Sequence, residues 1–270
     1  MELGLSGKTA LVTGASAGLG EAAAKLLAAE GVAVAIQGRN AERTHRVVEA
    51  IERAGGTAYA LLADLTKPSD VDKLANDALS ALGRVDILVA NAGGRTRQEM
   101  TTWDQTTIDD YMSAMQLNFF STARLIQLLA PGMKERRFGR IIAISSAAGL
   151  DPIPGQPDYG AAKAALISLV VSTSKWLKNC GVTINAVSPG AILTDALKTY
   201  LTNTAQQRDW QGDLGTFEAR AVKEMFRIPV GRVGRPEEVA GLVAFLASTY
   251  GGFFHGANLH MNGGVIGTVT

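Results

Sequence analysis

The chain has 270 residues, of which 47% are hydrophobic and 19% charged. This composition predicts a large buried core and excludes an intrinsically disordered chain. The net charge of +1 gives no sign of a nucleic-acid or membrane-surface partner. No apolar run approaches the ~18 residues that a membrane-spanning helix requires. Because the start of the chain also lacks the basic segment of a signal peptide, we expect a cytoplasmic protein.

Cysteine and histidine are rare in this sequence. The single cysteine, Cys180, excludes an intrachain disulfide and is consistent with a reducing cytosol. The three histidines, His45, His255 and His260, do not have the spacing of a metal site. We therefore expect no bound metal.

Short β-branched runs alternate with longer segments of helical periodicity along the chain. The predicted strands are 9–14, 32–37, 57–63, 86–91, 139–146, 182–188 and 257–261. The predicted helices are 18–30, 41–54, 68–82, 104–136, 158–179 and 236–248. Several strands are apolar on both alternations, which is typical of parallel strands covered by helices. The pattern predicts an α/β fold, a doubly wound parallel sheet with helices on both faces.

No linker or internal repeat divides the sequence, so residues 1–270 are predicted to form one domain. The segment 191–230 is different, because it is mostly polar and contains no predicted strand. A long insertion after the carboxyl end of a strand is placed to cover a ligand. We interpret this segment as a substrate-covering lid; the alternative is a helical hairpin that serves packing alone.

The first predicted strand leads into TGASAGLG (13–20), and a helix follows. Glycines at this point let the chain turn tightly and let the backbone approach a pyrophosphate, at which the helix N-terminus points. The loop predicts a dinucleotide site; the alternative is a glycine-rich turn without a ligand. The predicted cofactor contacts in this loop are Gly14, Ser16, Ala17, Gly18, Leu19 and Gly20.

The second predicted strand ends in IQGRN (36–40), which bears on the choice of dinucleotide. An NAD site usually carries an acidic residue ~20 residues after the glycine loop, bound to the ribose 2′-hydroxyl. Gly38 stands there instead, and the Arg39 guanidinium is available to bind a 2′-phosphate. We therefore predict NADP(H) over NAD(H), with Arg39 and Asn40 as contacts. A solvated arginine at a strand end is the alternative, and Ala17 supplies no second basic residue.

Tyr159 and Lys163 stand four residues apart in DYGAAKAAL (158–166), a spacing that places both on one helix face. A phenol is a suitable proton donor to a substrate oxygen if its pKa falls from ~10 toward the working pH. A nearby ammonium favours the phenolate, so we predict that Lys163 lowers the pKa of Tyr159. Taken alone, such a pair is usually an ordinary helix-surface pair.

With these motifs the sequence resembles the short-chain dehydrogenase/reductase family over nearly its whole length. TGASAGLG resembles the cofactor loop of that family, ADL (63–65) the segment whose aspartate contacts adenine, and NAG (91–93) the motif after the fourth strand. SPGAILT (188–194) resembles the turn that holds the nicotinamide, and GRPEEVAGLVAFLAS (234–248) the last helix. The resemblance implies a single Rossmann-type domain with a seven-stranded sheet. It adds the cofactor contacts Asp64, Leu65, Asn91, Ala92, Gly93, Tyr159, Lys163, Pro189, Gly190, Ile192 and Thr194.

The resemblance also implies four catalytic residues: Asn118, Ser146, Tyr159 and Lys163. Ser146 lies thirteen residues before Tyr159, as in the family, whereas Ser145 points to the opposite face of the strand. Tyr159 is then the general acid/base, Ser146 polarises the substrate oxygen, Lys163 binds the nicotinamide ribose, and Asn118 holds a water that relays protons to Lys163. Without this context Ser146 is a turn cap and Asn118 a buried helix amide.

The implied activity is hydride transfer between NADP(H) and a small-molecule carbonyl or alcohol substrate, in a homotetramer with helices 104–136 and 158–179 at one interface. The overall likeness is to 3-oxoacyl-carrier-protein-reductase-like members, so a 3-oxoacyl compound or another ketone is the expected substrate. The alternatives are an NAD-dependent alcohol or polyol dehydrogenase, a non-catalytic NADP-binding regulator, and a lyase or epimerase with a transient redox step.

The expected walls of the substrate pocket are 94–103, 150–156 and 191–227. Arg95 and Arg97 directly follow the NAG turn. They are candidate ligands for an acidic or phosphate-bearing substrate; the alternative is a pair of solvated loop arginines.

Overall fold

The computed structural model describes residues 2–96 and 100–267. Its strands are β1 (Thr9–Val12), β2 (Ala33–Gly38), β3 (Ala58–Leu62), β4 (Ile87–Ala90), β5 (Gly139–Ile144), β6 (Val182–Pro189) and β7 (Asn258–Met261). Its α-helices are α1 (Gly18–Ala29), α2 (Ala41–Arg53), α3 (Pro68–Leu82), α4 (Ile108–Met115), α5 (Ser121–Glu135), α6 (Pro157–Trp176), α7 (Asp195–Gln207), α8 (Leu214–Ala221) and α9 (Pro236–Ala247). Within these residues, none of the helices is long and apolar enough to cross a membrane.

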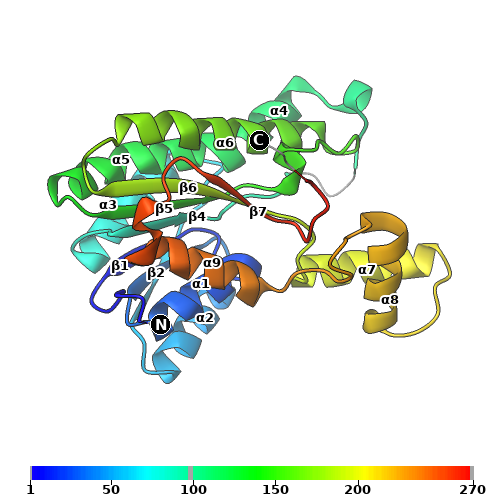
Figure 1. Cartoon of the computed structure of the whole chain (residues 1–270), viewed down its shortest axis with the longest axis horizontal. Coiled ribbons are helices and arrows are strands. Elements are labelled where there is room, and N and C mark those ends of the chain that lie inside the picture. The colour runs from blue at the N-terminus through cyan, green and yellow to red at the C-terminus, as the bar shows by residue number, and fades with distance from the viewer. Residues whose placement is uncertain (1, 97–99, 268–270) are drawn as a thin grey trace.

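All seven strands form one parallel sheet in the order β3-β2-β1-β4-β5-β6-β7 (Figure 1). The chain runs from β1 outward to β2 and β3, and then returns to place β4 on the other side of β1. The predicted doubly wound sheet is therefore confirmed. Its topological switch point lies at the carboxyl ends of β1 and β4, where open α/β sheets bind their ligands.

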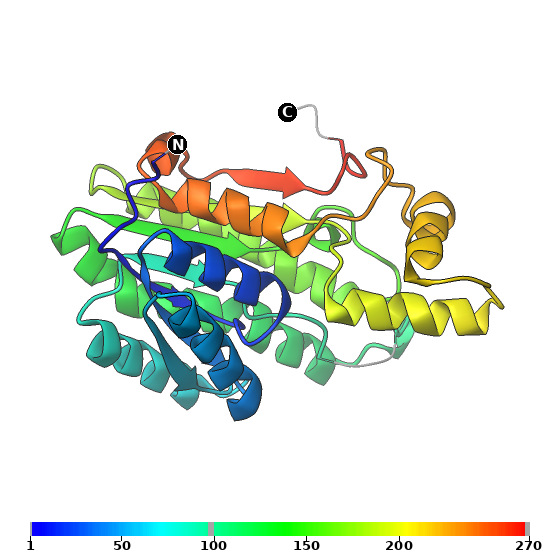
Figure 2. The same ribbon diagram turned by 90° about the horizontal axis from the view of Figure 1, so that it is seen from below.

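Helices cover both faces of the sheet (Figures 1 and 2). One face packs against α1, α2 and α9, with Leu27 and Val243 in its core. The other packs against α3, α5 and α6, with Leu129 and Leu166 in its core. The strands β1 and β4 are buried along their whole length because their side chains enter both layers.

The helix predicted over 104–136 is in fact two helices joined by a π-helical turn, Gln116–Phe120. The first helix begins only at Ile108, because Thr107 caps its N-terminus. The Thr107 hydroxyl accepts from the Asp110 backbone N–H at 3.2 Å, while the Asp110 carboxylate accepts from the Thr107 N–H at 2.8 Å. The π turn carries no breaker residue, so periodicity alone did not reveal it.

The segment 191–230 forms α7 and α8, which stand beyond the end of the sheet toward which β7 points (Figure 2). It has a small core of its own, which includes Leu201, Trp210 and Ala221. Arg235, the residue before α9, donates to both carboxylate oxygens of Glu218 in α8, at 3.0 and 3.2 Å. The hairpin therefore packs on itself and is tied to the main body by an ion pair.

Candidate active site

The glycine loop lies at the carboxyl end of β1 and is held there by the segment after β4. The Asn91 side chain donates to the carbonyl oxygens of Thr13 and Gly14, at 2.9 and 3.1 Å. The Thr13 hydroxyl accepts from the N–H groups of Asn91 and Ala92, at 3.0 and 2.9 Å. A Cβ at Gly14 would lie 2.8 Å from Ala92 Cα, and one at Gly20 would lie 2.5 Å from Asn91 Nδ2. Both positions therefore require glycine, because the two segments approach so closely.

Gln37 also holds this loop, and the sequence analysis missed it. Its side chain is buried in β2, accepts from the Gly14 N–H at 2.8 Å and donates to the Ala63 carbonyl at 2.8 Å. The available signal was a lone amide in the apolar run VAVAIQ, because a buried amide must find partners.

The end of β2 has no room for an acidic side chain. A Cβ at Gly38 would collide with the Thr44 hydroxyl and lie 2.9 Å from Ser16 Cβ. The next residue, Arg39, is exposed. The side-chain oxygen of Asn40 already accepts from the first turn of α2, at 2.9 Å. Among the described residues, Arg39 is therefore an exposed cation at the end of β2, and Gly38 before it has no room for a carboxylate.

Asp64 follows β3 near the same edge. Burial raises the pKa of its carboxyl group, but hydrogen bonds from Thr66 and the charges of Arg39 and Lys67 outweigh this and leave that pKa below its ordinary value. The Thr66 N–H and hydroxyl donate to it at 3.1 and 2.8 Å. Leu65, by contrast, is a core side chain whose carbonyl accepts from Gln116 at 3.2 Å.

Most of the remaining predicted cofactor contacts meet in one hollow of about 320 Å³. It is lined by Gly14, Ala17, Leu19, Asn91, Gly93, Gly94, Ile144, Ser145, Ser146, Tyr159, Lys163, Pro189, Gly190, Ile192 and Thr194. The predicted contacts outside this lining are Ser16, Gly18, Gly20, Arg39, Asn40, Asp64, Leu65 and Ala92. Glycine backbone on one wall and a lysine on another suit the pyrophosphate and the ribose of a nicotinamide dinucleotide. The residues present therefore fit this cofactor.

Ser146 and Tyr159 line this hollow and also an adjoining cavity of about 650 Å³. The neighbouring Ser145 is buried, and its hydroxyl donates to the Lys163 carbonyl at 2.9 Å. The Ser146 oxygen accepts from the Ala148 N–H at 3.2 Å. Of the two serines, Ser146 is therefore the one that reaches the place where the two hollows meet.

The electrostatics of Tyr159 differ from the sequence-based prediction. Burial raises the pKa of Tyr159, while a hydrogen bond with Ser146 and the charge of Arg95 act in the opposite direction. Lys163 is buried, donates to the Ile144 carbonyl at 2.7 Å and lies 5.8 Å from the centre of the Tyr159 ring. Burial lowers the pKa of Lys163 to about 8. The charge of Arg95 is thus a cation effect on Tyr159 that the sequence analysis did not predict, while Lys163 directs one of its donors to the backbone.

Asn118 is buried in the π turn, and both ends of its side chain bond to backbone. Its Nδ2 donates to the carbonyls of Ala114 and Gly94, at 2.9 and 3.0 Å, and its Oδ1 accepts from the Gly94 N–H at 2.9 Å. A Cβ at Gly93 would lie 2.6 Å from Asn118 Oδ1 and 2.9 Å from Lys163 Nζ. The amide therefore fixes the turn after β4 next to the lysine.

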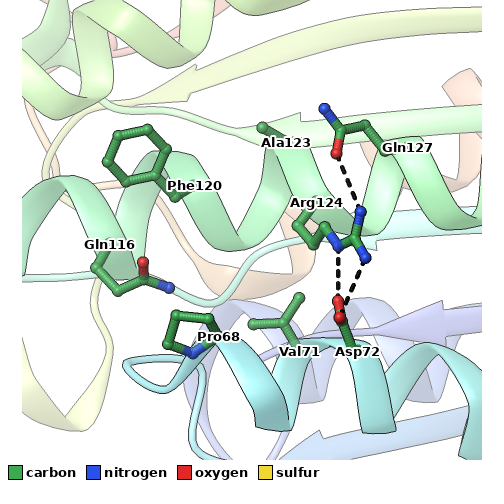
Figure 3. A pocket seen from close by; sticks show the side chains of 8 residues that line it. All are labelled: Pro68, Val71, Asp72, Gln116, Phe120, Ala123, Arg124 and Gln127. Atoms are coloured by element: carbon green, nitrogen blue, oxygen red, sulfur yellow. Dashed lines mark hydrogen bonds and ion pairs between the residues drawn. The ribbon is translucent and has the colours of Figure 1, made fainter.

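Another hollow, of about 350 Å³, lies between α3 and α5 (Figure 3). Arg124, which lines this hollow, donates to both carboxylate oxygens of Asp72, at 2.6 and 3.1 Å, and to the Gln127 side chain at 3.4 Å. The charged groups of this hollow are already paired with each other, and none of the four predicted catalytic residues lies there. We therefore do not assign the reaction to this hollow.

Comparisons with known proteins agree with this geometry. The family model of short chain dehydrogenases matches residues 8–205. The 7alpha-hydroxysteroid dehydrogenase of Escherichia coli K12 is 35% identical over 262 residues, which cover 97% of this chain and 95% of that protein. A 3-oxoacyl-[acyl-carrier-protein] reductase of Synechocystis is 34% identical over 264 residues, covering 97% and 98%.

Solved structures show the same relationship. L-sorbose reductase from Gluconobacter frateurii, complexed with NADPH and L-sorbose, superposes with a TM-score of 0.92 at 28% identity over the full length of both chains. A 7 alpha-hydroxysteroid dehydrogenase complexed with NADH and 7-oxo glycochenodeoxycholic acid superposes with a TM-score of 0.85 at 34% identity, covering 100% of this chain and 98% of that one. The chain therefore belongs to the short-chain dehydrogenase family and is an oxidoreductase that uses a nicotinamide nucleotide.

Proposed function

We propose that this enzyme reduces a ketone with NADPH, or oxidises the corresponding alcohol with NADP, and that Tyr159 is its general acid/base. One observation carries the proposal: Ser146 and Tyr159 line both the hollow that fits the cofactor and the larger cavity beside it. A substrate oxygen in that cavity is then in reach of a phenol and a hydroxyl at the edge of the cofactor hollow.

Proton transfer is the step that the protein side chains perform. The cofactor, when bound, supplies or takes up the hydride. As negative charge develops on the substrate oxygen, Tyr159 gives it the phenolic proton and Ser146 donates a hydrogen bond. Tyr159 carries this proton at neutral pH, because the ordinary pKa of a phenol is ~10. In the oxidation direction the phenolate removes the proton from the alcohol.

Lys163 and Asn118 position this site. Lys163 uses one of its three donors on the Ile144 carbonyl, which aims the ammonium along the wall of the cofactor hollow. We assign its remaining donors to the nicotinamide ribose. Asn118 holds the Gly94 backbone at both its N–H and its carbonyl, so it keeps the turn after β4 in register with the lysine. The relay water expected from the resemblance remains a proposal.

We assign the cofactor preference to NADP(H). Arg39 is exposed beside a position at which any Cβ would collide with Thr44, so a guanidinium is present and an acidic residue has no room. Arginine binds phosphate through two parallel hydrogen bonds, and a 2′-phosphate would be repelled by a carboxylate at that place. We assign the nearby Asp64 to the contact with the adenine of the cofactor.

We propose that residues 1–270 act as one catalytic domain and that 191–230 covers the substrate. Leu197 from α7, together with Met225 and Phe226 after α8, lines the same cavity as Tyr159. The hairpin therefore supplies an apolar wall to the cavity in addition to its own packing. A ketone with substantial apolar surface suits such a wall. The 3-oxoacyl compounds and steroids named for the relatives fall in this class.

The proposal is tested by binding and turnover on one sample. Purified protein is titrated with NADPH and with NADH, and a panel of ketones, 3-oxoacyl thioesters and sugars is then read by the loss of reduced-cofactor absorbance. We expect tighter binding of NADPH and turnover with apolar ketones. Binding without turnover across the panel would support a non-catalytic regulator instead. Substrate conversion without net cofactor oxidation would support an epimerase or a lyase.

We also propose a homotetramer in which α4, α5 and α6 form one interface. Large apolar side chains are exposed on these segments: Ile108, Met112, Phe120, Val171 and Trp176. A monomer rarely leaves so much apolar surface in water on neighbouring helices. Sedimentation at micromolar concentration is expected to give a tetramer, and Met112→Glu is expected to dissociate it. A wild-type monomer would contradict the proposal.

We propose a cytoplasmic location. The single cysteine, Cys180, is buried and unpaired, and its thiol donates to the Leu177 carbonyl at 2.8 Å. Such a residue requires no oxidising compartment. Fractionation of cells that express the chain tests this, and recovery in the periplasm or the medium would contradict it.

A further inference from the structure

The cavity beside Tyr159 is mostly apolar, and its polar side chains are those of Arg95, Ser146, Gln156, Tyr159 and Tyr200. Its walls are aliphatic and aromatic side chains such as Ile153, Leu197 and Phe226, and its volume is about 650 Å³. Among the described residues that line it, there is no aspartate, glutamate, lysine or histidine. Arg95 provides the single charged side chain of that lining, and Tyr159 and Tyr200 are its other titratable groups. The fixed charge that a substrate meets there is therefore positive.

Arg95 is an exposed residue, and the backbone before it is held by a buried side chain. It follows Gly94, whose N–H and carbonyl are both bonded to the Asn118 side chain, at 2.9 and 3.0 Å. In the part of the chain that the structure describes, no ion pair joins Arg95 to a carboxylate. Arg97, the other arginine of the sequence-based hypothesis, lies outside the described residues. Among the described residues, no carboxylate therefore occupies the Arg95 donors, and the backbone before Arg95 is held by Asn118.

The charge of Arg95 acts on the reacting group. It lowers the pKa of the Tyr159 phenol, against the effect of burial. Arg95 and Tyr159 line the same cavity, so a substrate bound there meets both side chains. A substrate that fills the cavity takes water away from Arg95, and this is costly unless an anion replaces the water. An anionic group removes that cost and forms charge-assisted hydrogen bonds.

We propose that Arg95 is a specificity-determining residue that binds an anionic group, a carboxylate or a phosphate, on an apolar carbonyl substrate held in the cavity that Arg95 and Tyr159 both line. This inference rests on the proposed function, because it concerns the substrate of the same site. The anion would neutralise Arg95 while the substrate is bound. Tyr159 would then hold its proton more firmly until negative charge develops on the substrate oxygen.

The test compares matched pairs of substrates. Oxo acids with two to about eight bonds between ketone and carboxylate are assayed against their methyl esters, and an oxoacyl phosphopantetheine is assayed against the oxoacyl pantetheine that lacks the phosphate. The first comparison reports on a carboxylate and the second on a phosphate. For at least one pair, kcat/KM of wild-type enzyme is expected to be about 10- to 100-fold higher for the anionic member, the range of a charge-assisted hydrogen bond.

Variants assign this preference to Arg95. In Arg95→Gln the ratio of kcat/KM for the anionic member over the neutral one is expected to fall toward one. Arg95→Lys keeps the charge but loses the planar fork, so it should retain part of the ratio. Arg53→Gln, an exposed arginine of α2, is the matched control and should keep the wild-type ratio. Removing the cation should also move the basic limb of the pH profile of kcat/KM for the neutral substrate to higher pH.

The outcomes separate this inference from the proposed function. A wild-type ratio near one for every pair, or an unchanged ratio in Arg95→Gln, overturns the role of Arg95 while the reductase stands. The absence of cofactor oxidation with every acid, ester and thioester overturns the reductase and this inference with it. An unchanged pH profile in Arg95→Gln would also contradict the electrostatic contact between Arg95 and Tyr159.

Discussion

The burial of Lys163 predicts how the free energy of unfolding depends on pH, and this prediction requires no substrate. Its ammonium is buried, with 2% of the residue exposed, and burial lowers its pKa from 10.5 to about 8. Between these two values the unfolded chain binds more protons at this residue than the folded protein does. The contribution of Lys163 to folding is therefore least favourable below pH 8, and it improves as pH rises toward 10.5. At about 1.4 kcal/mol per pH unit, the change from pH 7 to pH 10 is roughly 2–3 kcal/mol.

The assay is urea unfolding of the wild type and of Lys163→Met, at one protein concentration and at several pH values from 7 to 10. The difference in unfolding free energy between the two should change by that amount, in favour of the wild type as pH rises. Only the effects of the substitution that do not depend on the charge of Lys163, such as changes in packing, are the same at every pH and cancel. Lys175→Met, an exposed lysine of the same helix, is the control and should follow the wild type. Parallel curves for wild type and Lys163→Met would refute the buried ammonium.

Three further predictions concern cofactor choice, the serines and the glycines. Arg39→Asp should lower the NADPH/NADH ratio of kcat/KM by at least about tenfold, because a phosphate ligand becomes a repelling charge; a constant ratio would exclude Arg39 as that ligand. Ser146→Ala should reduce kcat, whereas Ser145→Ala should mainly lower Tm, because its hydroxyl holds the α6 backbone; the reverse pattern, in kinetics and thermal melts, would contradict our assignment. Gly20→Ala should weaken NADPH binding in a titration, because the new Cβ would lie 2.5 Å from Asn91 Nδ2. Gly241→Ala is the contrasting substitution: a Cβ at this position in α9 meets open space, so it should stabilise the protein by about 0.4–1 kcal/mol.

The sheet was predictable because its strands are continuous apolar runs and its crossovers are long. Each predicted strand appears, and the ends differ by a few residues, as for 9–14 against Thr9–Val12. The division of the long fourth helix was not predictable. It depends on a reciprocal cap at Thr107 and on a π turn, and neither interrupts the apolar periodicity.

The structure brings Ser146, Tyr159 and Lys163 to one hollow, as their motifs led us to expect, but their electrostatics were not predictable. The spacing of Tyr159 and Lys163 correctly placed them on one side of α6, yet it could not show that the ammonium bonds to the Ile144 carbonyl. That bond depends on the depth of the residue between α6 and β5, which is a tertiary property. For the same reason the sequence did not identify Gln37 as the anchor of the glycine loop, nor Arg95 as the cation that acts on Tyr159.

The central claim is that Tyr159 gives the proton to the substrate oxygen, and Tyr159→Phe tests it most directly. Once a carbonyl substrate is in hand, the rate of NADPH oxidation in this variant is measured beside its affinity for NADPH. We predict that kcat falls by at least about 100-fold, the usual contribution of a positioned acid, while the Kd for NADPH changes little, because the ring remains. A variant that oxidises NADPH with its substrate at the wild-type rate would contradict the account.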